Sequence, residues 1–285
     1  MPTKNIFDIK LKFKKMIKCN CLLGEGLFLY HDEAVWVDIE KDKLFIKKND
    51  SLSEIKLDYK PSVILNISET SITIGCDIGI ISFDRKQNQL NIVTTFLDQH
   101  EVNNFRSNDG CLFNDFFLIG FMHRNDTDLN AGYLYSVIGE KWNLLDNTIH
   151  IPNTFLKISD NSLLISDSHH SQIWKYTIDE KGKLLNKHLW AQLDENMTPD
   201  GGCLINNLVV ISLWDGACLL IFDIDGKVLG RLNMPVIRPT NCKYNSKANE
   251  LWVTSASIGL SKKQIKSFPY SGSTFVFDVE KRICK

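Results

Sequence analysis

Short runs of apolar residues rich in Val, Ile, Phe and Trp recur along the chain, each followed by a turn and a second short run. The first run of each pair is four or five residues long, which favours strands over amphipathic helices. Turn-forming dipeptides such as Asp109-Gly110 and Asp225-Gly226 lie between the runs. The six pairs of runs are 35–38 with 44–46, 72–75 with 79–84, 116–120 with 132–135, 163–167 with 173–176, 208–212 with 219–223, and 251–254 with 274–278.

The spacing of these pairs predicts an all-β, six-bladed β-propeller. Their first residues are 37 to 47 positions apart, which is the pitch of a four-stranded propeller blade. A propeller ring must close, usually by a strand from one terminus that joins the blade made by the other. We expect that strand within residues 1–20, with 6–13 as the candidate. A β-sandwich or jelly roll stays open as an alternative, although regular pairs at this pitch fit it less well.

Composition describes an ordinary globular protein. Of 285 residues 44% are apolar, and 33 Lys and Arg face 34 Asp and Glu. Because no linker-like segment or shift in composition divides the chain, we expect one domain over 1–285. The near-neutral charge argues against a nucleic-acid partner. Apolar runs such as 208–211 are far shorter than the roughly 20 residues of a membrane span, so we expect no membrane partner and a cytoplasmic location.

Familiar catalytic motifs are missing from the sequence. There is no nucleophile elbow, no phosphate-binding glycine loop and no His-Glu-x-x-His zinc motif. The eight Cys residues form no two closely spaced pairs of the zinc-knuckle kind, so we expect them to be reduced. Nothing in the sequence indicates an oligomeric state.

Four polar segments precede the first apolar run of a blade. In propellers the loops at one end of the central channel gather such residues from different blades into one pocket. Taken alone, each segment is a weak signal that fits a plain turn better than a binding site. The segments are LGEG at 23–26, RSNDG at 106–110, IPNT at 151–154 and TPDGG at 198–202.

The order of these segments resembles the family of senescence marker protein, regucalcin and gluconolactonase, almost from end to end. The matching stretches are GEGL at 24–27 leading into WVDI at 36–39, RSNDG at 106–110, GFM at 120–122 with GYLY at 132–135, the stretch from Asn153 through Asp167-Ser168 to IWKY at 173–176, PDG at 199–201, and PT at 239–240 with LWVTSA at 251–256.

The resemblance implies a six-bladed propeller whose channel holds one divalent metal ion. Its ligands would be Glu25, Asn153 and Asp200, an all-oxygen set that suits hard cations. We expect Ca²⁺ foremost, with Mg²⁺, Mn²⁺ or Zn²⁺ as alternatives. The resemblance also makes Asp200 the general base, and Arg106 and Asn108 the residues that contact substrate.

These roles predict a metal-dependent hydrolase that opens a sugar (aldonic acid) lactone such as gluconolactone, with the small-molecule lactone as its partner. Two alternatives stay open: a non-catalytic calcium-binding or regulatory propeller of the regucalcin type, and a related ester or phosphotriester hydrolase. The adjacent residues His169 and His170 have no counterpart in the family pattern. Two neighbouring residues of one strand face opposite sides, and we expect these two in a surface or loop role.

Overall fold

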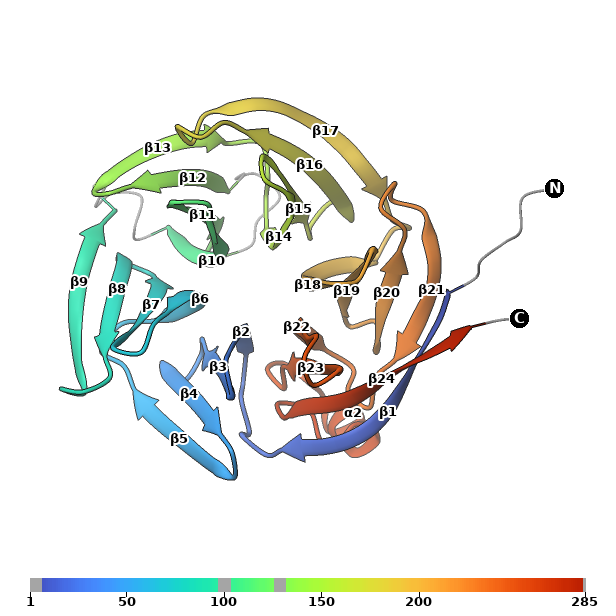
Figure 1. The fold of residues 1–285 in the computed structure, drawn as a ribbon. Coiled ribbons are helices and arrows are strands. Elements are labelled where there is room, and N and C mark those ends of the chain that lie inside the picture. The colour runs from blue at the N-terminus through green and yellow to red at the C-terminus, as the bar shows by residue number, and fades with distance from the viewer. Residues whose placement is uncertain (1–6, 97–103, 126–131, 284–285) are drawn as a thin grey trace.

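Six four-stranded antiparallel sheets surround a central axis (Figure 1). The computed structural model describes residues 7–96, 104–125 and 132–283. Within these ranges strands form almost the whole fold, and one short helix, α2 (Lys262–Ser267), precedes the last strand. The predicted all-β, six-bladed propeller is confirmed. No helix in the described ranges has the length and apolar character needed to cross a membrane.

The first five blades each consist of four consecutive strands, ordered from the axis outward. Their bounds are β2 (Gly24–Tyr30), β3 (Glu33–Asp38), β4 (Lys43–Lys48) and β5 (Ser51–Lys56); β6 (Pro61–Ile67), β7 (Ser71–Cys76), β8 (Gly79–Asp84) and β9 (Gln89–Thr95); β10 (Phe105–Phe113), β11 (Phe116–His123), β12 (Tyr133–Ile138) and β13 (Lys141–Asp146); β14 (Pro152–Ser159), β15 (Ser162–Asp167), β16 (Gln172–Ile178) and β17 (Leu184–Gln192); and β18 (Thr198–Ile205), β19 (Leu208–Trp214), β20 (Cys218–Phe222) and β21 (Val228–Asn233).

The sixth blade combines strands from distant parts of the chain. Its inner strands are β22 (Pro239–Asn245), β23 (Glu250–Ser255) and β24 (Thr274–Ile283), and β1 (Phe7–Ile17) lies outermost. β1 runs antiparallel to β24, with Phe7 opposite Ile283 and Ile17 opposite Thr274. Residues 1–6 of the segment expected to close the ring lie outside the described residues. The ring is thus joined by hydrogen bonds between the first and last described strands.

The polar segments of the sequence lie in innermost strands and not, as expected, in loops before the blades. The apolar runs that mark the six units are the second strands, from β3 to β23. Glu25 belongs to β2, Asn153 to β14 and Asp200 to β18. The predicted turn at Asp109-Gly110 is wrong as well, because both residues lie inside β10.

Every innermost strand contains a bulge where its pairing with the second strand shifts. Extra residues at a bulge bend the strand and re-aim the side chains around it, so the alternation that marks an ordinary strand is lost. The shifts lie between Glu25 and Phe28, Pro61 and Val63, Ser107 and Asp109, Asn153 and Leu156, Pro199 and Gly202, and Pro239 and Cys242.

Apolar clusters between neighbouring blades hold the ring together. One cluster joins Leu164 and Ile173 of the fourth blade to Val209 and Phe222 of the fifth. Polar contacts also cross between blades: the Asp146 carboxylate accepts from Lys187 Nζ at 2.7 Å and from the Tyr176 hydroxyl at 2.6 Å. Burial alone would raise the pKa of Asp146, yet these hydrogen bonds hold it below its usual range.

Replacing Ile9 by Ala tests the closure of the ring. Ile9 is buried and packs in one cluster with Phe277 and Val279. Its truncation should lower the free energy of unfolding by about 2 to 4 kcal/mol, because it leaves a cavity in this cluster, which joins the fifth and sixth blades. Urea unfolding followed by tryptophan fluorescence measures the change.

The matched control is Lys10→Ala, an exposed neighbour on the same strand. This change should alter the free energy of unfolding by no more than about 0.5 kcal/mol. Equal stability of Ile9→Ala and the wild type would mean that β1 contributes little to holding the ring closed.

Candidate active site

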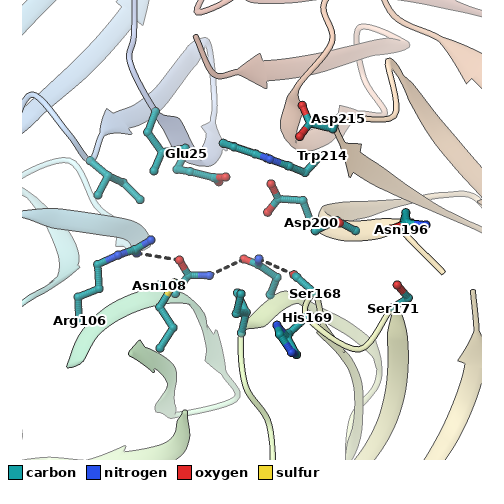
Figure 2. Close-up of a pocket in the computed structure, with 16 residues that line it drawn as sticks. Glu25, Arg106, Asn108, Ser168, His169, Ser171, Asn196, Asp200, Trp214 and Asp215 are labelled. Carbon is teal, nitrogen blue, oxygen red and sulfur yellow. Dashed lines mark hydrogen bonds between the residues drawn. The ribbon is translucent and has the colours of Figure 1, made fainter. Parts of the chain in front are cut away.

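The structure brings all five residues predicted for the site into one cavity of about 500 Å³. The predicted residues that line the cavity stand near the starts of innermost strands (Figure 2). Its walls come from several blades, so the side chains meet only because the ring is closed. The predicted residues that line it are Glu25, Arg106, Asn108, Asn153 and Asp200.

Glu25 and Asp200 form a buried pair of carboxyl groups. Both are less than a tenth exposed, and the charge of Glu25 acts on Asp200. Burial, followed by the charge of Asp109, raises the pKa of Glu25 to about 8. Burial and the charges of Glu25 and Asp109 raise the pKa of Asp200 well above its usual range. A cation between the two groups would relieve this repulsion and favour the ionised forms.

A chain of hydrogen bonds fixes the amide groups beside this pair (Figure 2). Arg106 Nη1 donates to Asn108 Oδ1 at 2.8 Å, and Asn108 Nδ2 donates to Asn153 Oδ1 at 2.9 Å. Asn153 Nδ2 in turn donates to the Ser168 hydroxyl at 2.8 Å. Because an amide oxygen has two lone pairs, Asn153 Oδ1 can accept from Asn108 and still offer a lone pair to a cation.

The backbone after Asn153 is strained. Thr154 and Phe155 adopt positive φ angles of 79° and 38° at the bulge of β14, a region that costs about 1 to 3 kcal/mol for residues with a side chain. The Thr154 hydroxyl donates to the carbonyl oxygen of Asp200 at 2.6 Å. This bond links Thr154, the residue after Asn153, to the backbone of Asp200. It therefore connects the two strands that carry the predicted ligands Asn153 and Asp200.

A third buried acid, Asp109, was not predicted as a site residue. It is 5% exposed, and its Oδ1 accepts from the Gly110 backbone N–H at 2.8 Å. Burial raises its pKa to about 6, although the positive charge of Lys243 opposes the shift. Asp109 lines a second cavity of about 230 Å³, together with Asn241 and Lys243. Asp109 belongs to the polar segment 106–110, but its Asp-Gly pair indicated a turn, so it was not predicted as a site residue.

Two further features of the pocket were not identified from sequence. Ser168 orients the Asn153 amide, and its hydroxyl donates to the Pro199 carbonyl at 2.6 Å. Trp214 supplies a flat wall (Figure 2). The Arg238 guanidinium lies over the Trp214 ring at 4.6 Å and pairs with Asp215 at 2.6 Å. Trp214 follows an apolar run in the sequence, so nothing distinguished it from a residue of the hydrophobic core.

His169 and His170 lie in the turn between β15 and β16, and not on a strand. His169 lines the pocket, while His170 is exposed and contacts the Asp167 carboxylate at 2.9 Å. The seven Cys residues within the described ranges are free thiols, and Cys284 lies outside those ranges.

Comparisons with known proteins agree with this architecture. Residues 23–257 match the family model described as SMP-30/Gluconolactonase/LRE-like region. A 100-residue stretch is 29% identical to regucalcin of Gallus gallus and covers 34% of this chain and 33% of that protein. The chain therefore matches only about a third of the length of this curated relative.

Two solved structures show the same fold. Regucalcin from Agrobacterium tumefaciens, titled a calcium-binding protein, superposes with a TM-score of 0.86 at 22% identity, over 94% of this chain and 95% of that one. A protein from Xanthomonas campestris titled a gluconolactonase superposes with a TM-score of 0.70 at 16% identity, over 93% and 88%. At these identities the likeness establishes the fold alone. Because the family model covers most of the sequence, this chain belongs to the SMP-30/gluconolactonase/LRE-like family.

Proposed function

We propose that this protein is a divalent-metal-dependent hydrolase that opens a sugar lactone. The observation that carries the proposal is the meeting of Glu25, Asn153 and Asp200 with Arg106 and Asn108 in one cavity. The titles of structural relatives, a calcium-binding regucalcin and a gluconolactonase, support both parts of it.

The residues present fit a hard cation. Glu25, Asn153 and Asp200 would hold it through two carboxylates and an amide oxygen, which favours Ca²⁺, Mg²⁺ or Mn²⁺ over softer ions. The raised pKa values of Glu25 and Asp200 show that the folded chain alone compensates their charge poorly. When bound, the ion would supply a Lewis acid that polarises the carbonyl of the lactone.

We assign the role of general base to Asp200. It is buried among polar groups at the centre of the pocket (Figure 2), and its ionised carboxylate would take a proton from the attacking water. Arg106 and Asn108 would orient the lactone and stabilise negative charge on its oxygens. Because Asn108 Oδ1 accepts from Arg106 Nη1 at 2.8 Å, Asn108 would hold the Arg106 guanidinium in a fixed orientation toward the lactone.

Trp214 would complete the binding surface. The Arg238 guanidinium lies over its indole ring and is itself held by Asp215, so the ring is a fixed apolar platform in the wall of the pocket. A sugar ring carries C–H groups on its faces and hydroxyls around its edge. The platform and the polar groups of Arg106 and Asn108 therefore match the two kinds of surface that a sugar lactone offers.

A calcium-binding regulatory protein without turnover is the second candidate, because the bacterial relative with the same fold is titled a calcium-binding protein. A related ester or phosphotriester hydrolase would use the same polarised electrophile. All three candidates require the cation, and only two require hydrolysis.

An assay of gluconolactone and related lactones tests the proposal. The purified protein should hydrolyse at least one sugar lactone, lose that activity on treatment with a chelator, and regain it on addition of Ca²⁺, Mg²⁺ or Mn²⁺. Titration of the released acid measures the rate. Metal binding without hydrolysis across the lactone panel would favour the regulatory protein, and hydrolysis of aryl esters alone would favour the third candidate.

Asp200 variants separate the roles of ligand and base. Asp200→Asn keeps an oxygen ligand but removes the base, so kcat should fall by about 10² to 10⁴-fold while metal binding weakens only in part. Asp200→Ala should lose both. Calorimetry measures metal affinity beside the kinetic assay. The control is Asp160→Asn on the exposed turn after β14, which should keep wild-type kinetics. A fully active Asp200→Asn would refute the base assignment.

The buried acids predict how stability depends on pH. In chelator-treated protein the folded-state pKa of Glu25 lies near 8, above its ordinary 4.5. The folded state therefore binds more protons than the unfolded state between these values, so the free energy of unfolding should fall as pH rises through this window. Thermal unfolding at several pH values measures the slope.

The control for this measurement is Glu25→Gln, which cannot ionise. It should show a shallower fall than the wild type, and Ca²⁺ should flatten the wild-type curve because the ion pairs with the ionised carboxylates. Identical slopes for the two proteins would contradict the assigned environment of Glu25.

A further inference from the structure

We infer that His150, Asp167 and His170 form a second metal site, which takes a borderline divalent ion such as Zn²⁺. One ligand atom from each residue lies within 4.8 Å of the other two. His150 lies just before β14, Asp167 ends β15, and His170 lies in the turn after it. None of the three is among the predicted ligands of the pocket.

The distances suit a small ion. His170 Nδ1 lies 2.9 Å from Asp167 Oδ2, and His150 Nδ1 lies 3.9 Å from the same oxygen. Zinc binds His nitrogen and carboxylate oxygen at about 2.0 to 2.2 Å, and its ligands stand in a tetrahedron about 3.3 Å apart. Small rotations of exposed or half-buried rings would bring the three atoms to that spacing. The side chain of His170 is 44% exposed and that of His150 19%, so an ion can enter from solvent.

The carboxylate is held in place by the backbone. Asp167 is 2% exposed, and it accepts hydrogen bonds from the N–H groups of His150, Ile151 and His169 at 3.0 to 3.2 Å. Metal ligands in proteins are commonly oriented by such outer hydrogen bonds. The His150 ring also stacks on His169, with centroids 5.0 Å apart and planes 17° apart.

The first blade contains an aspartate, Asp38, in the position that corresponds to Asp167 in the fourth blade. There Asp38 accepts from the N–H groups of Leu22 and Leu23 at 2.8 and 3.0 Å, as Asp167 accepts from His150 and Ile151. Asp38 pairs with the first residue of β2, and Asp167 with the first residue of β14. The carboxylate is therefore explained by blade architecture in both places.

The two imidazoles are not explained in this way. In the first blade Leu22 takes the place of His150, and Lys41, three residues after Asp38, takes the place of His170. That blade keeps its backbone bonds to the aspartate without any imidazole. In the fourth blade, two imidazoles therefore lie beside a carboxylate that backbone hydrogen bonds already hold in place.

The donor set points to the ion. Two imidazole nitrogens and one carboxylate oxygen suit Zn²⁺, and also Co²⁺, Ni²⁺ or Cu²⁺, whereas Ca²⁺ prefers six or more oxygens. Three protein ligands leave a fourth position for water. The two sites of this chain therefore differ in the class of cation they select.

Calorimetric titration of Zn²⁺ into the full chain, stripped with chelator and then saturated with Ca²⁺, tests the inference. The wild type should bind one Zn²⁺ that Ca²⁺ does not displace. His150→Ala and His170→Ala should each weaken that binding by at least about 10-fold, and the double variant should abolish it. Loss of nitrogen coupling in the electron paramagnetic resonance spectrum of bound Cu²⁺ gives a second readout.

Two controls keep the result independent of the proposed lactonase. His188→Ala removes an exposed histidine of β17 outside the group and should leave Zn²⁺ binding unchanged. Glu25→Gln alters the pocket and should also keep it. Circular dichroism checks that each variant is folded. Equal Zn²⁺ affinity in the wild type and the folded double variant, or complete displacement of Zn²⁺ by Ca²⁺, would overturn the second site.

Discussion

The six innermost strands converge on one axis. The close approach of their backbones determines which side chains fit at the pocket. A Cβ atom placed on Gly26 would lie 2.7 Å from Val63 Cα of the next blade, and one on Gly201 would lie 2.4 Å from Asn241 Cγ. Neither contact is tolerable, so glycine is required at both points. This crowding buries Glu25 and Asp200, and burial raises the pKa of both carboxyl groups.

Short polar bonds transmit this arrangement around the ring. Ser62 of β6 donates to Ser107 of β10 at 2.8 Å, and Asn108 donates to the Pro152 carbonyl at 3.1 Å. Thr240 of β22 donates to the Gly24 carbonyl, next to Glu25. Each bond ties one innermost strand to its neighbour. The positions of the predicted ligands therefore depend on the whole ring, and a change in one blade will shift side chains of the next.

Strands that are buried on both faces could be predicted from the sequence, whereas the innermost strands could not. The second strands were visible in the sequence because residues such as those of β3 and β15 are buried on both faces, which gives unbroken apolar runs and hence the number of blades. The innermost strands were not visible in the sequence, because bulges and polar side chains interrupt the alternation of apolar and polar residues. Glu25, Asn153 and Asp200 were found by their resemblance to a family, whereas Asp109 and Trp214 were hidden behind a turn motif and a core pattern.

The pairing of β1 with β24 has a consequence for biosynthesis. The ribosome makes β1 before the five intervening blades and β24 after them. During most of translation β1 therefore has no partner strand. An unpaired strand edge invites association with other nascent chains. Lys10, Lys12 and Lys14 alternate along β1, and their mutual repulsion would keep waiting copies apart until the last blade emerges.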